Sequence, residues 1–297
     1  MTSIATIFAL SFLGPVLASA APAAASSPTG FYLSIGASES VGVQPTALHP
    51  RGQVTNEGYT NDVTNMLSSE GVNVNLVELG CPGESTASTV SGLDHCYHAS
   101  DSQLSDAVAF LRAHTNDPGL VTVDLGFNDL RPCIAQEFAD PSCVGTQLAL
   151  VRDNLETILS KLVAAAGPKV TIVGLNHDNP FLADAVNHTH DLNFAADSTS
   201  AIDALNTTLS DVYASYAIPV ANVASAYANA LATPTRLAHV GWVPLDVQRA
   251  CTWTWMCRSG AYGPNIHPND TGYAAMARAV VLALPPRFFA AFSSPSS

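Results

Sequence analysis

The chain has 297 residues, of which 47% are hydrophobic and 12% are charged, so it can bury a large core and is not compositionally disordered. Its formal charge of −13 at pH 7 opposes binding to nucleic-acid phosphates and to anionic lipid headgroups, and we therefore expect no nucleic-acid partner. No internal repeat or long polar linker divides the sequence, which favours one globular unit.

The N-terminus has features of a secretory signal. An apolar stretch ends in Ala-Ser-Ala, with small residues where a signal peptidase cuts, and we predict a signal peptide over 1–20, although no Lys or Arg precedes Arg51. An uncleaved membrane anchor is the less favoured alternative, because the stretch is short and Ala-rich for a span of about 20 residues. Residues 21–30 are predicted to be a flexible Pro/Ala/Ser segment, and 31–297 a single domain.

Short apolar runs alternate with segments of helical periodicity after this region. The predicted strands cover 31–36, 74–79, 120–126, 169–175 and, more weakly, 218–223. The predicted helices cover 58–71, 102–115, 146–167 and 271–284. This alternation predicts an α/β fold with a mostly parallel sheet that is covered by helices on both faces.

Because parallel strands point the same way, the loops after them meet at one edge of the sheet. Four loops follow the four clearer strands, at 36–40, 80–86, 126–130 and 175–180. We expect the functional site at this edge.

The six cysteines lie in three sequence-local pairs, namely Cys81 with Cys96, Cys133 with Cys143, and Cys251 with Cys257. An even number behind a signal peptide indicates oxidised pairs in a secreted protein, although six cysteines allow 15 connectivities. Nearest-neighbour pairing is our prediction, and buried free thiols are the alternative. A zinc site is less favoured, because no paired CxxC spacing occurs.

Ser38 stands two residues beyond Gly36, which ends the first predicted strand. The segment is not the G-x-S-x-G elbow of α/β-hydrolases, because Ser40 occupies the position of the second glycine. A Gly-x-Ser sequence alone is weak evidence for a nucleophile.

Two further loops offer hydrogen-bond donors at the same edge. Asn128 has a side-chain amide of the kind that an oxyanion hole requires, and a turn or helix cap is the alternative interpretation. Gly83 lacks a side chain, so its N–H can approach a ligand closely. A turn with positive φ, or an N-cap at Ser85 or Thr86, would also explain that loop.

His267 lies in a loop just before the last predicted helix. A serine hydroxyl is a poor nucleophile until a base takes its proton, and an imidazole with a pKa near 6.5 suits that role. Other histidines in His-Cys-Tyr-His (95–98) and His-Thr-His (188–190) suggest a metal, but no carboxylate completes a recognisable zinc motif. We therefore predict no metal and no cofactor.

Taken in chain order, the blocks GAS, GCPGEST, GFND and NIHPND resemble the consensus blocks of the SGNH (GDSL-type) hydrolases. The resemblance covers 31–284 and is greatest to secreted actinobacterial-type members with three disulfides. It implies a flavodoxin-like three-layer α/β/α sandwich. It also implies that Ser38 is the nucleophile and, through its own N–H, one oxyanion donor, that Gly83 and Asn128 are the other donors, and that His267 is the general base.

The chain departs from this pattern twice. Ala37 replaces the aspartate of the usual G-D-S block, and Pro264 stands where the family has an aspartate three residues before its histidine. A backbone carbonyl near Pro264, or the side-chain oxygen of Asn265, would then orient the His267 ring in a Ser–His dyad. Asp178, after the fourth strand, is a more remote candidate for the missing acid.

The resemblance predicts a secreted, extracellular serine esterase or lipase that hydrolyses carboxylic esters through an acyl-enzyme on Ser38. The alternative is a catalytically weak or inactive ligand-binding protein of the same fold. We expect a monomer without a stable membrane anchor, and either a lipid or a carbohydrate ester as substrate. Four aromatic residues near the base form either an acyl or sugar wall or ordinary loop packing: Trp242, Trp253, Trp255 and Tyr262.

Overall fold

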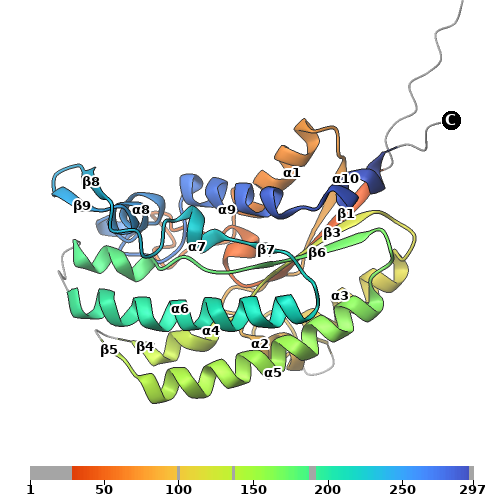
Figure 1. Cartoon of the computed structure of the whole chain (residues 1–297), viewed down its shortest axis with the longest axis horizontal. Helices are drawn as coiled ribbons and strands as arrows, with labels where there is room; N and C mark the ends of the chain where they lie inside the picture. The colour runs from red at the N-terminus through yellow and green to blue at the C-terminus, as the bar shows by residue number, and fades with distance from the viewer. Residues whose placement is uncertain (1–28, 99–100, 136–137, 187–191, 294–297) are drawn as a thin grey trace, which may run out of the picture.

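A five-stranded parallel sheet lies at the centre of the computed structural model (Figure 1). The structure describes residues 29–98, 101–135, 138–186 and 192–293. The strands are β1 (Gly30–Gly36), β2 (Val74–Glu78), β3 (Gly119–Asp124), β6 (Val170–Leu175) and β7 (Val220–Ala221). The predicted signal peptide over 1–20, and most of the predicted flexible segment over 21–30, lie outside the described residues.

The order of the strands is β2-β1-β3-β6-β7, so the chain moves from β1 first to one side of the sheet and then to the other. In doubly wound sheets, ligands bind beyond the carboxyl ends of the strands at the point where this direction reverses. That point lies between β1 and β3, whose last residues, Gly36 and Asp124, are register partners. The topology therefore favours a site next to Gly36, where the sequence places Ser38.

Burial explains why β1 and β3 are continuous apolar runs. Every residue of both strands is buried, because helices cover the two faces of the sheet. Neighbours along β1 point to opposite faces: Leu33 belongs to one hydrophobic cluster and Tyr32 to the other. The edge strand β2 is only partly buried.

Two layers of helices cover the sheet (Figure 1). The face that contains Leu33 packs against α3 (Gln103–Ala113), α5 (Pro141–Ala165) and α6 (Leu192–Ser215). The face that contains Tyr32 packs against α1 (Tyr59–Ser69), α9 (Asp270–Ala283) and α10 (Pro286–Phe292). The predicted α/β fold with a three-layer α/β/α arrangement is thereby confirmed.

Side-chain caps define where the predicted helices begin. Ser102 caps α3 by accepting from the N–H of Ser105 at 3.1 Å. Helix α5 begins five residues before the predicted start at 146, because Asp140 accepts from Ser142 N–H at 2.9 Å and Pro141 occupies the first turn.

Several elements were not predicted from the sequence. The longest is α6, and two antiparallel hairpins join β4 (Ile134–Ala135) to β5 (Phe138–Ala139) and β8 (Pro234–Leu237) to β9 (Gly241–Pro244). The other short helices are η1 (Glu39–Val41), α2 (Thr86–Ser91), α4 (Phe127–Leu130), η2 (Arg131–Cys133), η3 (Pro180–Ala185), α7 (Val223–Ala226), α8 (Leu245–Trp253) and η4 (Gly260–Tyr262).

Three disulfides join the sequence-local cysteine pairs that were predicted: Cys81–Cys96, Cys133–Cys143 and Cys251–Cys257. The first follows β2, the second follows α4, and the third precedes the loop of His267. The disulfides therefore constrain three of the loops that surround the expected site.

No single helix in the described ranges is long and apolar enough to cross a membrane, and only α9 and α10 taken together, across a bend of 87°, meet that length and composition.

Candidate active site

The loop that carries Ser38 is held in place at the end of β1. The Gly36 N–H donates to Oε1 of Gln103 at 2.6 Å, and Nε2 of Gln103 donates back to the Gly36 carbonyl at 3.0 Å. The Ala37 N–H donates to the carbonyl of Asp124 at 3.3 Å. A side chain at position 36 would approach that same carbonyl to 2.8 Å, so only glycine fits. These contacts fix Ser38 relative to the end of β3.

Three of the predicted site residues, Ser38, Asn128 and His267, line one small pocket at this edge of the sheet. The pocket has a volume of about 20 Å³, and its wall includes Glu39 and His177. The fold therefore brings together a hydroxyl, an amide and an imidazole that are far apart in the sequence.

The ring of His267 is oriented by the side chain of Asn265. The Asn265 Nδ2 donates to the carbonyl of Pro50 at 3.1 Å, which turns its Oδ1 toward the histidine. This oxygen accepts from the backbone N–H of His267 at 3.0 Å and lies 2.6 Å from Nδ1 of the ring. Because an amide oxygen only accepts, the proton is assigned to Nδ1, and Nε2 keeps its lone pair. A ring in this tautomer can act as a base through Nε2.

The two other groups considered for orienting this ring do not contact it. Within the described ranges, no hydrogen bond joins the His267 ring to the Pro264 carbonyl, and no hydrogen bond or ion pair joins it to Asp178. Asp178 instead lies buried after β6, near Glu39 and Asp124.

Burial lowers the pKa of His267 to about 4, because desolvation disfavours the imidazolium, and the positive charge of Arg131 acts in the same direction. The ring is therefore neutral at pH 7. A neutral imidazole is the form that can accept a proton from a hydroxyl.

Two backbone N–H groups of the predicted oxyanion hole have no partner. Gly83 has a φ of +89°, and no atom lies within 4 Å of the place where its Cβ would be. Neither the N–H of Gly83 nor that of Ser38 has a hydrogen-bond partner among the described residues. Gly83 does not line the pocket that Ser38, Asn128 and His267 share.

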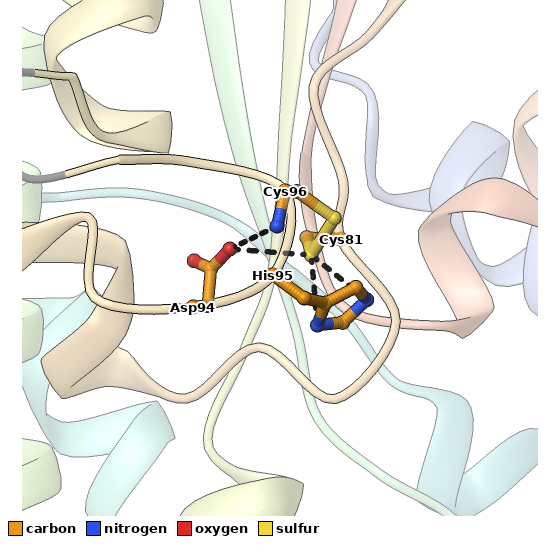
Figure 2. A group of neighbouring side chains, drawn as sticks. All are labelled: Cys81, Asp94, His95 and Cys96. Atoms are coloured by element: carbon orange, nitrogen blue, oxygen red, sulfur yellow. Dashed lines mark hydrogen bonds between the residues drawn. A yellow bond between two sulfur atoms is a disulfide. The ribbon is translucent and has the colours of Figure 1, made fainter.

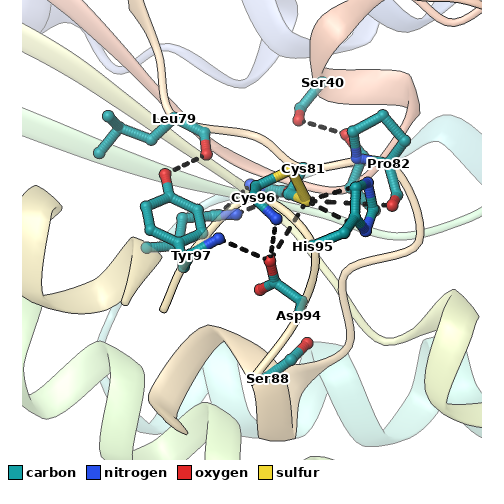
Figure 3. Close-up of a disulfide and its surroundings, with 12 residues drawn as sticks. Ser40, Leu79, Cys81, Pro82, Ser88, Asp94, His95, Cys96 and Tyr97 are labelled. Carbon is teal, nitrogen blue, oxygen red and sulfur yellow. Dashed lines mark hydrogen bonds between the residues drawn. A yellow bond between two sulfur atoms is a disulfide. The ribbon is translucent and has the colours of Figure 1, made fainter. Parts of the chain in front are cut away.

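A disulfide fixes the loop that contains Gly83. Cys81, two residues before the glycine, is bonded to Cys96 (Figure 2). Asp94 Oδ1 accepts from the backbone N–H groups of Cys96 and Tyr97 at 2.6 and 2.9 Å. The Tyr97 hydroxyl donates to the carbonyl of Leu79 at 2.6 Å, next to the end of β2 (Figure 3). The loop is thus anchored at both ends.

Asn128 and Asp129 join this loop to the end of β3. The Asn128 Nδ2 donates to the carbonyl of Glu84 at 3.0 Å, and an amide nitrogen carries a second proton that this bond does not use. The buried Asp129 carboxylate accepts from the Thr86 N–H at 2.9 Å and from the Thr86 hydroxyl at 2.6 Å. The two oxyanion candidates outside the Ser38 loop therefore belong to one hydrogen-bonded unit.

Comparison with known families identifies the chain. Residues 35–275 match the model of the GDSL-like lipase/acylhydrolase family, so the match contains all four blocks described above. The chain belongs to the GDSL-like lipase/acylhydrolase family. No curated protein sequence matches it.

Solved structures of GDSL-type and other lipases share the fold. The chain is 14% identical to phospholipase A1 from Streptomyces albidoflavus NA297. The alignment covers 86% of this chain and 99% of the phospholipase chain, with a TM-score of 0.56. It is also 14% identical to an extracellular lipase from Streptomyces rimosus, with an alignment that covers 87% of this chain and 100% of the lipase chain and a TM-score of 0.54. A lipase from a goat rumen metagenome is 15% identical, with coverage of 86% and 97% and a TM-score of 0.51. At these identities the likeness concerns the fold.

The pocket wall also contains ionisable groups that were not selected from the sequence. Glu39, Asp124 and His177 all line the pocket beside Ser38. Glu39 is adjacent to Ser38 in sequence, and Asp124 lies inside the predicted strand 120–126, so both positions could be read from the sequence. What the sequence did not provide was their proximity to His177.

The histidines that suggested a metal motif have other surroundings. Nε2 of His95 lies 3.6 Å from Sγ of Cys81, whose sulfur is in the disulfide and is not a free thiolate ligand (Figure 2). The His-Thr-His segment at 188–190 lies outside the described residues.

The four aromatic residues near the predicted base do not line the pocket of Ser38. Trp255 stacks on Tyr262 with ring centroids 5.7 Å apart, and its Nε1 donates to Gln44 at 3.2 Å. Trp253 packs edge-on against Tyr227. Trp242 is 68% exposed on β9, with the guanidinium of Arg236 over its ring.

Proposed function

We propose that this member of the GDSL-like family is a secreted serine esterase that hydrolyses carboxylic esters through an acyl-enzyme on Ser38. One observation carries the proposal: Ser38, Asn128 and His267 line the same pocket, while Asn265 holds the imidazole in the tautomer of a base. The membership of the chain in a lipase/acylhydrolase family supports the same reaction class.

The reaction follows from the proton positions. Nε2 of His267 takes the Ser38 proton as Oγ attacks the ester carbonyl, and the imidazolium then gives this proton to the departing alcohol. A water molecule, deprotonated by the same nitrogen, attacks the acyl-serine and releases the acid, which regenerates the hydroxyl. Each step moves one proton through one ring nitrogen.

Three donors would stabilise the negative charge of the tetrahedral intermediate. They are the N–H groups of Ser38 and Gly83, which have no other partner among the described residues, and the second proton of Asn128 Nδ2. Preorganised donors of this kind act where charge develops, and removal of one donor typically lowers kcat by about 100- to 1000-fold.

The general base of this site is supported by a neutral group. Asn265 orients the ring as a carboxylate would, but it carries no charge to stabilise the imidazolium that forms during attack. We therefore infer a Ser–His dyad with a lower turnover than a triad with an aspartate gives. The same feature favours the second candidate function, a ligand-binding protein with little catalysis.

Three disulfides and the N-terminal sequence support export of the chain, and we infer a monomeric extracellular enzyme. Both lipid esters and acetylated carbohydrates fit a site that needs only an ester carbonyl at Ser38. A chain-length series of p-nitrophenyl esters together with an acetylated sugar distinguishes these substrate classes.

The direct test compares wild type with Ser38→Ala on p-nitrophenyl acetate, butyrate and octanoate, with disulfides intact. The proposal predicts that Ser38→Ala lowers kcat by roughly 1000-fold or more, because the nucleophile is lost. Ser40→Ala is the matched control, since its hydroxyl only donates to the carbonyl of Ala37 in the same loop at 2.7 Å. Equal activity of Ser38→Ala and wild type rejects the proposal, and an inactive wild type favours the ligand-binding protein.

A further inference from the structure

A compact group of ionisable side chains lies beside the Ser38 loop and has no part in the reaction proposed above. Glu39 is in η1, Asp124 is the last residue of β3, and His177 follows β6. One donor atom from each, two carboxylate oxygens and a ring nitrogen, lie within 4.8 Å of one another. All three residues line the small pocket next to Ser38.

Two carboxylate oxygens, one in this group and one beside it, are buried without a partner among the described residues. Asp124 is only 2% exposed, and its Oδ2 has no hydrogen bond among the described residues. The neighbouring Asp178 is 3% exposed, and its Oδ2 also has no hydrogen bond among the described residues. Buried polar groups nearly always have a partner, so orphaned carboxylate oxygens at this density point to a ligand.

The ring of His177 presents a lone pair to the carboxylates. Its Nε2 lies 3.0 Å from the carbonyl of Leu125, which can only accept, so the ring proton is assigned to Nε2. Nδ1 then faces Asp124 Oδ1 at 3.8 Å, too far for a hydrogen bond. Metal-binding histidines commonly donate their second nitrogen to a carbonyl in this way.

The backbone of His177 is fixed from both sides by one side chain. Oδ1 of Asn206 accepts from the His177 N–H at 2.8 Å, and Nδ2 of Asn206 donates to the His177 carbonyl at 2.8 Å. The ring direction is therefore determined by the protein itself, before any ligand binds.

Nothing in the described chain neutralises the carboxylates. No lysine or arginine there forms an ion pair with Glu39, Asp124 or Asp178. Desolvation raises the pKa of Asp124 and Asp178, each to about 7, and desolvation together with their negative charges raises the pKa of Glu39 well above its usual range.

We propose that Glu39, Asp124 and His177 form a binding site for one divalent transition-metal ion, with Asp178 as a nearby further oxygen donor. Metal–ligand distances of about 2.0–2.2 Å in a tetrahedral site place two ligands of one ion about 3.3–3.6 Å apart, so donor atoms that now lie within 4.8 Å of one another must approach by up to about 1.5 Å. A set of one imidazole and two carboxylates fits Zn²⁺ or Mn²⁺ better than the oxygen-only cations.

The bound ion would connect three strand ends at the site. It would tie Glu39, the residue after Ser38, to the ends of β3 and β6. Its role is to hold the Ser38 loop, since the pairing of Ser38 with His267 needs no metal. The proposal is independent of the esterase reaction, because it rests on the geometry and burial of these side chains and not on the role of Ser38.

The test measures metal binding directly. Wild-type protein is stripped with a chelator, dialysed and titrated with ZnCl₂ or MnCl₂ by isothermal calorimetry, and bound metal is counted by mass spectrometry after equilibrium dialysis. We expect one ion per chain. At free metal about 100 times above Kd, we expect the Tm to rise by roughly 5 °C or more.

Matched variants locate the ion. Glu39→Gln and His177→Gln each remove one donor and are expected to raise Kd at least about 10-fold. His95→Gln changes a histidine in a separate group of side chains, which also contains Asp94 and the Cys81–Cys96 disulfide. This variant and Ser38→Ala are both expected to bind the metal with wild-type affinity. Far-UV circular dichroism shows whether each variant is folded. If either Glu39→Gln or His177→Gln fails to fold, the other one carries the test.

Two results overturn the proposal. One is a wild-type protein that binds neither Zn²⁺ nor Mn²⁺ in a 1:1 ratio. The other is equal affinity in wild type, Glu39→Gln, His177→Gln and His95→Gln, which places the ion elsewhere. Because Ser38→Ala retains the metal ligands, failure of the metal site and failure of the esterase assignment give different patterns.

Discussion

At the scale of single residues, the site depends on how His267 is held. Aspartate is the family's usual residue for this task, and here a neutral amide, Asn265, does it from a position two residues before the histidine. From the sequence, three groups could orient this ring: a backbone carbonyl near Pro264, the side chain of Asn265 and the more remote Asp178. Only the hydrogen bond of Asn265 to the Pro50 carbonyl, a contact across 215 residues of chain, determines which oxygen faces the ring.

Replacing Asn265 with leucine should separate positioning from stability. Without its Oδ1 the ring loses its tautomer and direction, so we expect kcat to fall roughly 100-fold or more, with KM little changed. Asn269→Ala is the control on the same loop: it removes the cap of α9, a bond to Thr271 N–H at 3.0 Å, and should cost about 1 kcal/mol of stability without changing kcat. A leucine variant with wild-type kcat would show that the amide has no catalytic role.

The pH dependence of the reaction reports the state of the same ring. Burial and Arg131 lower the pKa of His267 to about 4, so the base remains neutral well below pH 6.5. We expect kcat/KM to fall with decreasing pH at a midpoint nearer pH 4 than pH 6.5. Arg131→Met should move this midpoint to higher pH, because a positive charge that disfavours the imidazolium is removed. A limb at pH 6.5 that Arg131→Met leaves unchanged would contradict the burial argument. Ester hydrolysis followed by titration of released acid measures the profile.

At the scale of elements, two of the disulfides constrain the loops of the proposed oxyanion donor Gly83 and the proposed base His267. Cys81–Cys96 spans 15 residues around the Gly83 loop, and Cys251–Cys257 spans only 6 before the His267 loop. The chain-entropy model gives about 3 kcal/mol for the longer loop and about 2 kcal/mol for the shorter one.

Paired alanine substitutions test this ranking by reversible denaturant unfolding. We expect the variant without Cys81 and Cys96 to lose more stability than the variant without Cys251 and Cys257. The first should also lose several-fold in kcat, because the Gly83 donor is less well positioned. The opposite order of stability would mean that native contacts outweigh the restriction of the unfolded chain.

The sequence was most informative where an element buries both faces or ends in a cap. β1, β3 and β6 were evident as continuous apolar runs. Helix α6 was missed because its many Ser, Thr and Asn residues obscured a helical spacing at Ile202, Leu205, Leu209 and Val212, all of which are fully buried. The hairpin of β8 and β9 is held by pairing and by contacts with α8, which local sequence does not specify.

The candidate site was predictable to a similar degree. The loops after parallel strands had to meet, so Ser38 and Asn128 were expected near each other, and the block of His267 indicated the third member. The contact of Glu39 with Asp124 and His177 was not predictable, because it depends on which way three side chains point at one sheet edge.

At the scale of the whole molecule, buried carboxyl groups should make stability depend on pH. In metal-free protein the pKa values of Asp124 and Asp178 are raised to about 7, and that of Glu84 to about 8, so the folded state holds protons that the unfolded chain has released. This contribution is greatest below about pH 4 and is lost as the pH rises through 7 to 8. His267 and His177 act oppositely, but only below about pH 6.5, since burial lowers their pKa values.

Between pH 6.5 and 8 the carboxyl groups therefore dominate, and the free energy of unfolding should fall as the pH rises. Glu39→Gln should flatten this slope, because one buried carboxyl group with a raised pKa is removed. Urea unfolding in the presence of a chelator, repeated across this pH range, measures both slopes. A stability that rises toward pH 8, or a slope unchanged in Glu39→Gln, would contradict the assigned protonation states.

The pairing of the Ser38 hydroxyl with the His267 imidazole is best tested by a fluorophosphonate probe, with the modified residue located by tandem mass spectrometry. We predict one adduct per chain, on Ser38, that persists in Ser40→Ala and is lost or greatly slowed in His267→Ala. An adduct on another residue, or labelling of Ser38 at an undiminished rate in His267→Ala, would contradict the account.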